Sequence, residues 1–232
     1  MASTDQPTAV DYAGSRRLER WQPLTAVAFV VCFVASVVVS SVPADNAPDL
    51  TWTRAYTGTA NAREHLATGI LLVLAALSLL SFLTLLSTRI AAARRPAAIS
   101  PLPLVAAGVS AACISVGGVM MASISGSILI GSMHVPNADE LRFANDTGFA
   151  MVSVAGMLAA ALSIACLSIQ ARSAHVFGTK MMRFGIVVSI ALLGAVAFAP
   201  IAALLIWLLV AAYTVTRSTQ RERAEAPAQL TS

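Results

Sequence analysis

Residues 66–87 read LATGILLVLAALSLLSFLTLLS and contain no charged side chain. A helix rises 1.5 Å per residue, so about 20 apolar residues cross the ~30 Å hydrocarbon core of a bilayer. Three further runs, at residues 24–42, 104–132 and 148–170, have the same character. The chain is 57% hydrophobic and 11% charged, whereas about a quarter of the residues in a soluble domain are charged. The sequence therefore predicts an all-α fold, a polytopic transmembrane helix bundle.

The last apolar run, Phe184–Thr216, has two interpretations. As one tilted, Pro-kinked helix it gives five spans, and as a hairpin divided at Pro200 it gives six. Pro200 suits the first turn of a new helix, where its missing N–H loses no hydrogen bond. Six spans place twelve of the fifteen Lys and Arg residues on one side and leave Arg54, Arg63 and Arg142 on the other, whereas five spans give nine against six. The positive-inside rule favours six spans, with both termini in the cytoplasm.

This topology predicts the organisation of the chain. A cytoplasmic tail, residues 1–23, precedes the bundle of residues 24–217, and a second tail, residues 218–232, follows it. The spans are expected at about residues 24–42, 66–87, 104–132, 148–170, 184–199 and 200–216. Residues 1–14 and 224–232 are rich in small and polar side chains and are expected to be disordered. The first run exceeds the ~7–15 apolar residues of a signal peptide, so we expect it to be retained as a helix.

The composition also indicates a location. Arg outnumbers Lys fourteen to one, which is typical of coding in a GC-rich bacterium, and we expect the plasma membrane of such a cell. The net charge of +4 comes from residues beside the spans, where membrane orientation explains it. Nucleic acid is therefore not an expected partner. The lipid bilayer is, and a membrane-protein partner or a second copy of the chain is a further candidate.

Small residues gather in the run 104–132. Gly118, Ala122 and Gly126 recur every four residues and form a ridge on one helix face, and Gly148 and Gly156 continue the pattern in the next run. Such ridges let helix backbones approach closely in lipid. We interpret these five residues as helix-packing positions.

Serines give the same run a second interpretation. Ser115, Ser123 and Ser127 would line a polar groove for a ligand if their side of the helix were free. Trp207 lies midway along the last span, where its indole N–H needs an acceptor on a neighbouring helix or on a ligand. Packing is the favoured interpretation of both features.

The outer loops collect most remaining polar groups. Glu64, His65, His134, Asn145 and Asp146 are expected to reach the same membrane surface, and histidine and carboxylate groups of this kind bind metals in other proteins. Their spacing matches no metal motif, so we favour solvated loop residues and helix caps. Asn145 and the two residues after it fit the N-terminal cap of the span that begins at residue 148.

No ionisable side chain lies within the predicted spans, although intramembrane charge is the usual marker of a proton, ion or substrate pathway. The three cysteines, Cys32, Cys113 and Cys166, fall in separate runs without the spacing of a metal or redox motif. We therefore expect no enzyme, no cofactor and no metal.

Several stretches of the second half stand out together: FANDTGFA at residues 143–150, the basic loop 171–183, the apolar run ending in Pro200, the WLLV stretch 207–210 and Arg217. In their order these parts resemble a family of six-helix integral membrane proteins of unknown function that is common in actinobacteria. Residues 43–49 and 61–65 are similar but less distinctive. The loop 171–183 lacks the Pro-Arg-Trp-Leu stretch expected of the family, which leaves the start of the fifth span open. The resemblance implies six spans and no particular activity.

These observations predict a non-enzymatic accessory, scaffold or regulatory membrane subunit, since small packing faces are present and catalytic groups are not. The alternative is a binder or permease for an apolar or lipid-like molecule. A metal-dependent enzyme at the outer face is a third and weaker hypothesis.

Overall fold

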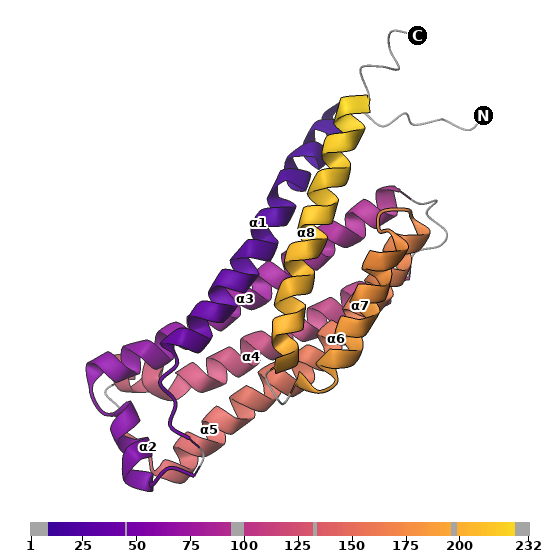
Figure 1. Ribbon diagram of the computed structural model, residues 1–232. Helices are drawn as coiled ribbons and strands as arrows, with labels where there is room; N and C mark the ends of the chain where they lie inside the picture. Colours follow the sequence, from indigo (N-terminus) through magenta and orange to yellow (C-terminus); the bar gives the residue numbers. More distant parts are fainter. Residues whose placement is uncertain (1–8, 45, 94–99, 132–133, 196–198, 226–232) are drawn as a thin grey trace, which may run out of the picture.

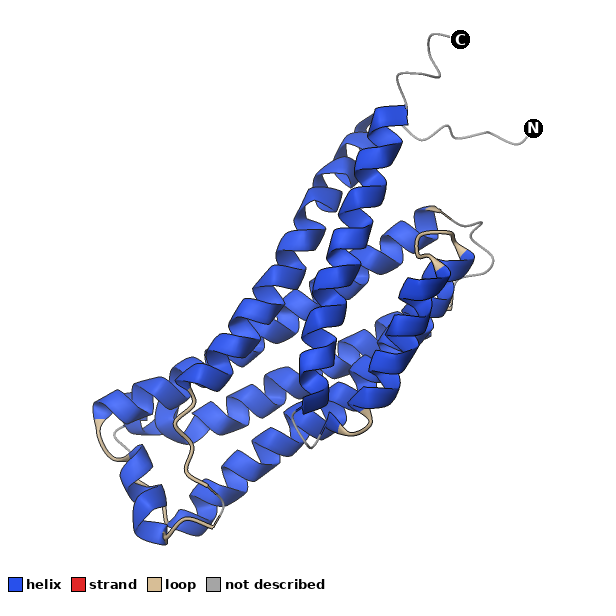
Figure 2. Cartoon of the chain, in the orientation of Figure 1, coloured by secondary structure: helices blue, strands red, loops and turns tan. Residues whose placement is uncertain are grey.

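The structure, a computed structural model, describes residues 9–44, 46–93, 100–131, 134–195 and 199–225, and the regular structure of these residues is helical (Figures 1 and 2). The helices are α1 (Ala9–Val39), α2 (Asp49–Tyr56), α3 (Thr59–Ala92), α4 (Leu102–Gly131), α5 (Ala138–Ala150), the π-helix η2 (Met151–Gly156), α6 (Met157–Ser173), α7 (Thr179–Leu192) and α8 (Ala199–Glu225).

Five stretches of the described residues are long and apolar enough to cross a membrane. They are Trp21–Val39, Thr59–Ala92, Leu102–Gly131, Ala138–Ser173 and Pro200–Ser218. The prediction of an all-α, membrane-embedded helix bundle is confirmed at this level.

Helices α3 and α4 pack backbone against backbone. A Cβ atom added to Gly69 would clash with the Ala122 Cβ and would lie 2.5 Å from the Gly118 carbonyl oxygen. On the other side of α4, a Cβ on Gly117 would lie 2.5 Å from the Gly148 carbonyl oxygen. Small residues therefore bring α4 into close contact with both α3 and α5, as expected for helices that associate in lipid.

The fourth span is one continuous helical stretch made of α5, η2 and α6. Its N-terminal cap is Asn137, whose Oδ1 accepts a hydrogen bond from the Glu140 N–H at 2.9 Å. The predicted cap at Asn145 is therefore wrong, because the helix begins well before the apolar run and Asn145 lies inside α5. Asp139 and Glu140 in the first turn suit the positive end of the helix dipole.

The last apolar run forms two separate helices and not one kinked helix. Helix α7 ends at Leu192 and α8 begins at Ala199, so Pro200 lies in the first turn of α8, where the sequence placed it. Of the predicted span 184–199, residues 184–192 belong to α7, which is Thr179–Leu192, and residues 196–198 lie outside the described residues. The 14 residues of α7 correspond to about 21 Å at 1.5 Å per residue. A helix of this length is short for a hydrocarbon core of ~30 Å.

Two further predictions need correction. The loop predicted between the first two spans contains the short helix α2, which the sequence did not indicate. Residues 9–14 and 224–225, predicted to be disordered, are helical. The predicted disorder of residues 1–8 and 226–232 lies outside the described residues.

Candidate ligand-binding cavity

The α7–α8 hairpin turns before it reaches the end of the bundle at which α2 lies. In Figure 1, α8 begins beside the middle of the bundle, while α3, α4 and α5 continue past it toward α2. Ile201, in the first turn of α8, faces the same cavity as Phe33 of α1 and Val152 of η2. Between this turn and the end of the bundle at which α2 lies, the hairpin helices α7 and α8 are missing from the bundle. A half-open cavity of about 240 Å³ begins beside Ile201.

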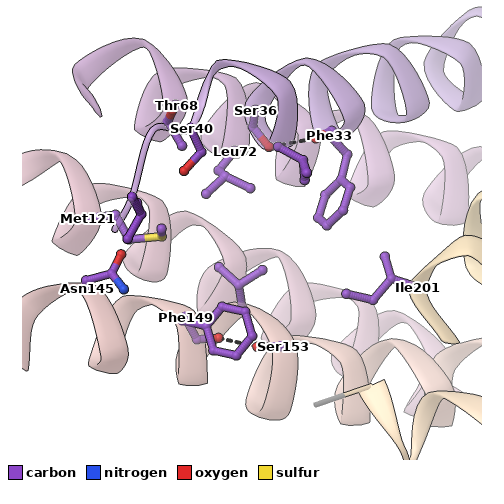
Figure 3. Close-up of a pocket in the computed structure, with 13 residues that line it drawn as sticks. Phe33, Ser36, Ser40, Thr68, Leu72, Met121, Asn145, Phe149, Ser153 and Ile201 are labelled. Carbon is purple, nitrogen blue, oxygen red and sulfur yellow. Dashed lines mark hydrogen bonds between the residues drawn. The ribbon is translucent and has the colours of Figure 1, made fainter. Parts of the chain in front are cut away.

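The cavity is lined by α1 and the residues that follow it, and by α3, α4, α5, η2 and α8 (Figure 3). The lining residues are Phe33, Ser36, Val37, Ser40, Val42, Thr68, Leu72, Met121, Asn145, Phe149, Val152, Ser153 and Ile201. Most are apolar and none is charged. Binding pockets for drug-sized molecules measure ~300–1,000 Å³, so this cavity fits a small molecule or part of a larger amphiphile.

Polar groups concentrate toward one end of the cavity. Figure 3 shows Ser40, Thr68 and Asn145 toward one end, and Phe33 and Ile201 toward the other. This arrangement agrees with their positions in the chain, because Ser40 directly follows α1, whereas Phe33 lies about two turns earlier in that helix. The polar end is therefore the end near α2.

Three hydroxyl groups in the lining already donate their hydrogen to their own helix. The Ser36 Oγ donates to the Phe33 carbonyl at 2.7 Å, and the Thr68 Oγ1 donates to the Glu64 carbonyl at 3.0 Å. The Ser153 Oγ donates in the same way to the Phe149 carbonyl (Figure 3). Each hydroxyl has one hydrogen and two lone pairs, so these oxygens are available to the cavity only as acceptors.

Asn145 carries the main unpaired polar group of the cavity. The residue is 8% exposed, and its Oδ1, itself fully buried, has no hydrogen-bond partner among the described residues, so a ligand pairs with it only after a small rotation of the amide toward the cavity. The Nδ2 lies 3.4 Å from the Asp146 Oδ1, a contact that suits this orientation of the amide because a carboxylate only accepts hydrogen bonds. Leaving a buried acceptor unpaired costs about 1–3 kcal/mol. Such a group indicates a binding site more strongly than any apolar part of the lining.

The π-helix η2 shapes the wall beside Asn145. A π-turn adds one residue to a helical turn and so changes the direction of the side chains that follow. The neighbouring residues Val152 and Ser153 both line the cavity. The Ser110 Oγ of α4 donates to the Gly156 carbonyl at 2.8 Å and holds the end of η2 against α4.

The serine face predicted for a ligand is not part of this cavity. Ser123 and Ser127 are exposed on the outside of α4, Ser115 is half-buried, and none of the three lines the cavity. The Ser123 Oγ donates to the Met120 carbonyl of its own helix. Trp207 is also remote from the cavity: it is fully buried, and its Nε1 has no partner among the described residues.

The predicted outer polar residues do not converge on one site. Glu64, His134 and Asp146 are exposed, whereas His65 is buried with its ring stacked on Tyr56 at a centroid distance of 4.2 Å. Within the described part of the chain, no three His, Cys, Asp or Glu side chains come close enough to hold a metal. Only Asn145 of this set lines the cavity.

Helix α2 packs on α5 and α3 at the end of the bundle nearest the polar end of the cavity, although none of its own residues lines the cavity. Trp52 and Tyr56 pack with Leu141 of α5, and Val42 contacts both this cluster and the cavity. Arg142 holds α2 in place, since its Nη2 donates to the Asp49 carboxylate at 2.7 Å and to the Ala47 carbonyl at 2.8 Å. We refer to α2 and the residues it packs on as the outer cap.

The outer cap is expected to loosen at high pH. Burial raises the pKa of the Tyr56 phenol to about 12, from an ordinary value of 10.0. Between these two values the unfolded chain binds fewer protons than the folded protein, so the free energy of unfolding falls as the pH rises through this window. In an absorbance titration of tyrosinate, we expect a phase near pH 12 that is missing from the Tyr56→Phe protein. An identical titration of both proteins would contradict the burial of this ring.

No protein-family model, curated protein or solved structure matches this chain. The resemblance to the six-helix actinobacterial family therefore stays a prediction. The chemistry of the cavity is therefore the main guide to the function of this chain.

Proposed function

We propose that this is a six-span membrane protein that binds a lipid-like amphiphile in the cavity beneath the outer cap, to hold it or to let it pass. The observation that carries the proposal is the unpaired Asn145 Oδ1, buried in the wall of a half-open and otherwise mainly apolar cavity. An apolar pocket with a few convergent polar groups is the usual form of a small-molecule site.

The location of the cavity favours a ligand that arrives from the bilayer. Val37 lines the cavity and is 47% exposed, and the next residue, Val38, is 77% exposed. Both belong to a stretch that is apolar and long enough to cross a membrane. Lipid is therefore expected to contact this exposed part of the cavity wall, which we take as its opening. None of the lining residues is ionisable. Binding is therefore favoured over catalysis, which normally uses such groups for proton transfer.

Six crossings are part of the proposal. Helix α8 returns alongside α7, and the start of α1 and the end of α8 lie at the same end of the molecule (Figure 1). The Arg89 Nη2 donates to the Ser218 Oγ at 3.0 Å, which places the end of α3 there as well. With Arg172, Lys180 and Arg217 in the segments that meet this end, the positive-inside rule makes it cytoplasmic. A bacterial plasma membrane fits the Arg-rich composition.

The accessory-subunit hypothesis loses one of its supports. It rested in part on small-residue faces, which could pack within the bundle or against a partner protein. Gly118 packs against Leu72 of α3, and Gly156 packs against Ile114 of α4. These faces are used within the chain, so they give no reason to propose a partner or a homo-oligomer.

The test of the proposal is to block the opening. We expect wild-type protein, extracted gently and analysed by native mass spectrometry, to retain an adduct of lipid mass. In the Val37→Trp protein, an indole placed in the opening should lower the retained adduct about tenfold, equivalent to about 1.4 kcal/mol.

The matched control is Val38→Trp, which adds the same indole at the neighbouring, more exposed position that does not line the cavity. We expect this protein to keep its adduct. A wild-type protein without any lipid adduct, or a Val37→Trp protein that keeps it in full, would refute binding in the cavity.

A further inference from the structure

We propose that the polar head of the bound amphiphile is an uncharged hydrogen-bond donor, a free hydroxyl group, so that the ligand is a neutral lipid alcohol. This inference rests on the proposed function and specifies its ligand. The inference is supported by the oxygens that surround the cavity. They come from α1, α3, α5 and η2 and act as hydrogen-bond acceptors, and no charged side chain lines the cavity.

The lining offers more acceptors than donors. The hydroxyl hydrogens of Ser36, Thr68 and Ser153 are taken by backbone carbonyls one turn earlier in their own helices. The Asn145 Nδ2 faces Asp146, which leaves the Oδ1 as the unpaired atom. Ser40, half-buried beyond the end of α1, is free to donate or accept. A ligand that brings its own hydrogen satisfies these oxygens, and a ligand that brings only lone pairs does not.

The charge of the ligand head narrows the choice of ligand class further. A phosphate or carboxylate head is negatively charged and offers mainly acceptors, so it would face the acceptor oxygens without a cation among the lining residues to balance it. An ammonium head is a donor, but it would be buried without a carboxylate among the lining residues, which is costly. An ester or ether head leaves the Asn145 Oδ1 unpaired. A hydroxyl is uncharged and supplies the missing hydrogen.

The shape of the cavity gives the orientation of the ligand. The acceptors Thr68 and Asn145 lie toward the outer cap, and Phe33 and Ile201 lie toward the α7–α8 turn (Figure 3). The hydroxyl is therefore placed under the outer cap, and the first part of one chain lies against Phe33. A volume of about 240 Å³ holds no more than this, so the rest of the lipid is expected to leave the cavity beside Val37, a lining residue that is 47% exposed.

The test compares three probes with the same two acyl chains. They are 1,2-dioleoylglycerol, its 3-O-methyl ether, in which a methyl group replaces the hydroxyl hydrogen, and dioleoyl phosphatidic acid, which carries a phosphate instead. Full-length protein in phosphatidylcholine nanodiscs is loaded with tritiated dioleoylglycerol, and each probe is used to displace it. We expect the alcohol to bind about tenfold more tightly than the ether, since a site built to pair a hydroxyl rejects the analogue without it. The phosphatidic acid should displace the tritiated lipid even less well.

Variants of the protein then test whether Asn145 causes the preference for the alcohol over the ether. Asn145→Leu removes the acceptor at similar size and should bring the ratio of alcohol to ether affinity close to one. Ser123→Ala, which removes a hydroxyl from the outside of α4, should leave the ratio unchanged. A wild-type ratio near one would overturn the inference about the head while leaving lipid binding intact. If neither the alcohol nor the ether binds, the proposed function itself fails. The wild-type ratio decides the matter even if Asn145→Leu does not fold.

Discussion

Replacing Gly117 with alanine is expected to lower the free energy of unfolding by about 2–3 kcal/mol, the upper part of the range for overpacked sites. The new Cβ would lie 2.5 Å from the Gly148 carbonyl oxygen and 2.7 Å from the Val152 Cγ2. The first of these atoms belongs to the backbone of α5 and has no rotamer by which to move away. Alanine also favours a helix by about 1 kcal/mol over glycine, and the clash has to exceed this gain.

The effect should appear in unfolding by sodium dodecyl sulfate titrated into mixed micelles, followed by circular dichroism. Gly108→Ala is the matched control on the same helix, because nothing lies within 4 Å of its added Cβ. We expect that protein to be as stable as wild type or slightly more stable. Gly117→Ala should also weaken lipid binding, since Val152 lines the cavity. If both variants unfold alike, α4 and α5 are not in backbone contact at this point.

The sequence predicted the packing helix and could not assign its neighbours. Gly118 and Ala122 do face Gly69 of α3, but Gly126 meets only the Leu66 Cδ1 at 3.9 Å. The contact with α5 is made instead by Gly117, one position along the chain. Adjacent residues point about 100° apart on a helix, so α4 has two small-residue faces. Which helix covers each face depends on the topology, and residue spacing does not contain that information.

Asn145 illustrates how a residue can be singled out for a role that the structure does not give it. It directly precedes the apolar run, which made it a natural cap for the predicted span. The length of an apolar run measures the crossing of the hydrocarbon core, however, and a helix can extend beyond it. Asn137, followed by Asp139 and Glu140, is the stronger start signal because acidic residues in the first turn accompany a capping oxygen. Recognition of that cap would have placed Asn145 inside the helix.

The cavity itself has no sequence motif, because its lining comes from several helices that are distant along the chain. The division of the run Phe184–Thr216 at Pro200 was predicted, but the sequence did not show where the resulting turn would lie along the bundle. In the structure α7 has only 14 residues, and Ile201 in the first turn of α8 lines the cavity. The cavity therefore depends on the position of this turn, which residue spacing does not contain.

Replacing Trp207 with alanine is expected to cost about 3 kcal/mol of stability, at the lower end of the range for buried tryptophan and phenylalanine. The indole is fully buried in α8, and its ring meets the Phe82 ring edge to face at a centroid distance of 6.4 Å. Its Nε1 also lies 3.0 Å from the position of a Cβ on Gly185 of α7. Trp207 therefore joins α3, α7 and α8. An apolar ring can be exposed to lipid without the penalty that it has in water. The expected loss of stability therefore comes from lost packing contacts alone, which favours a value near ~3 kcal/mol.

Two further variants separate the possible reasons for that loss. Trp207→Phe keeps an aromatic ring against Phe82 and removes the N–H, which has no partner among the described residues. If Trp207 acts through ring packing alone, loss of the N–H should have no effect of its own. The free energy of unfolding of Trp207→Phe should then differ from that of wild type by no more than about 1 kcal/mol, which is the usual net value of one hydrogen bond. Trp21→Ala, at a side chain that is 60% exposed, should change little. If Trp207→Phe unfolds as easily as Trp207→Ala under the same detergent titration, the indole N–H must have an acceptor in the membrane. In that case the short α7–α8 hairpin would be fixed by a hydrogen bond as well as by the shape of the ring.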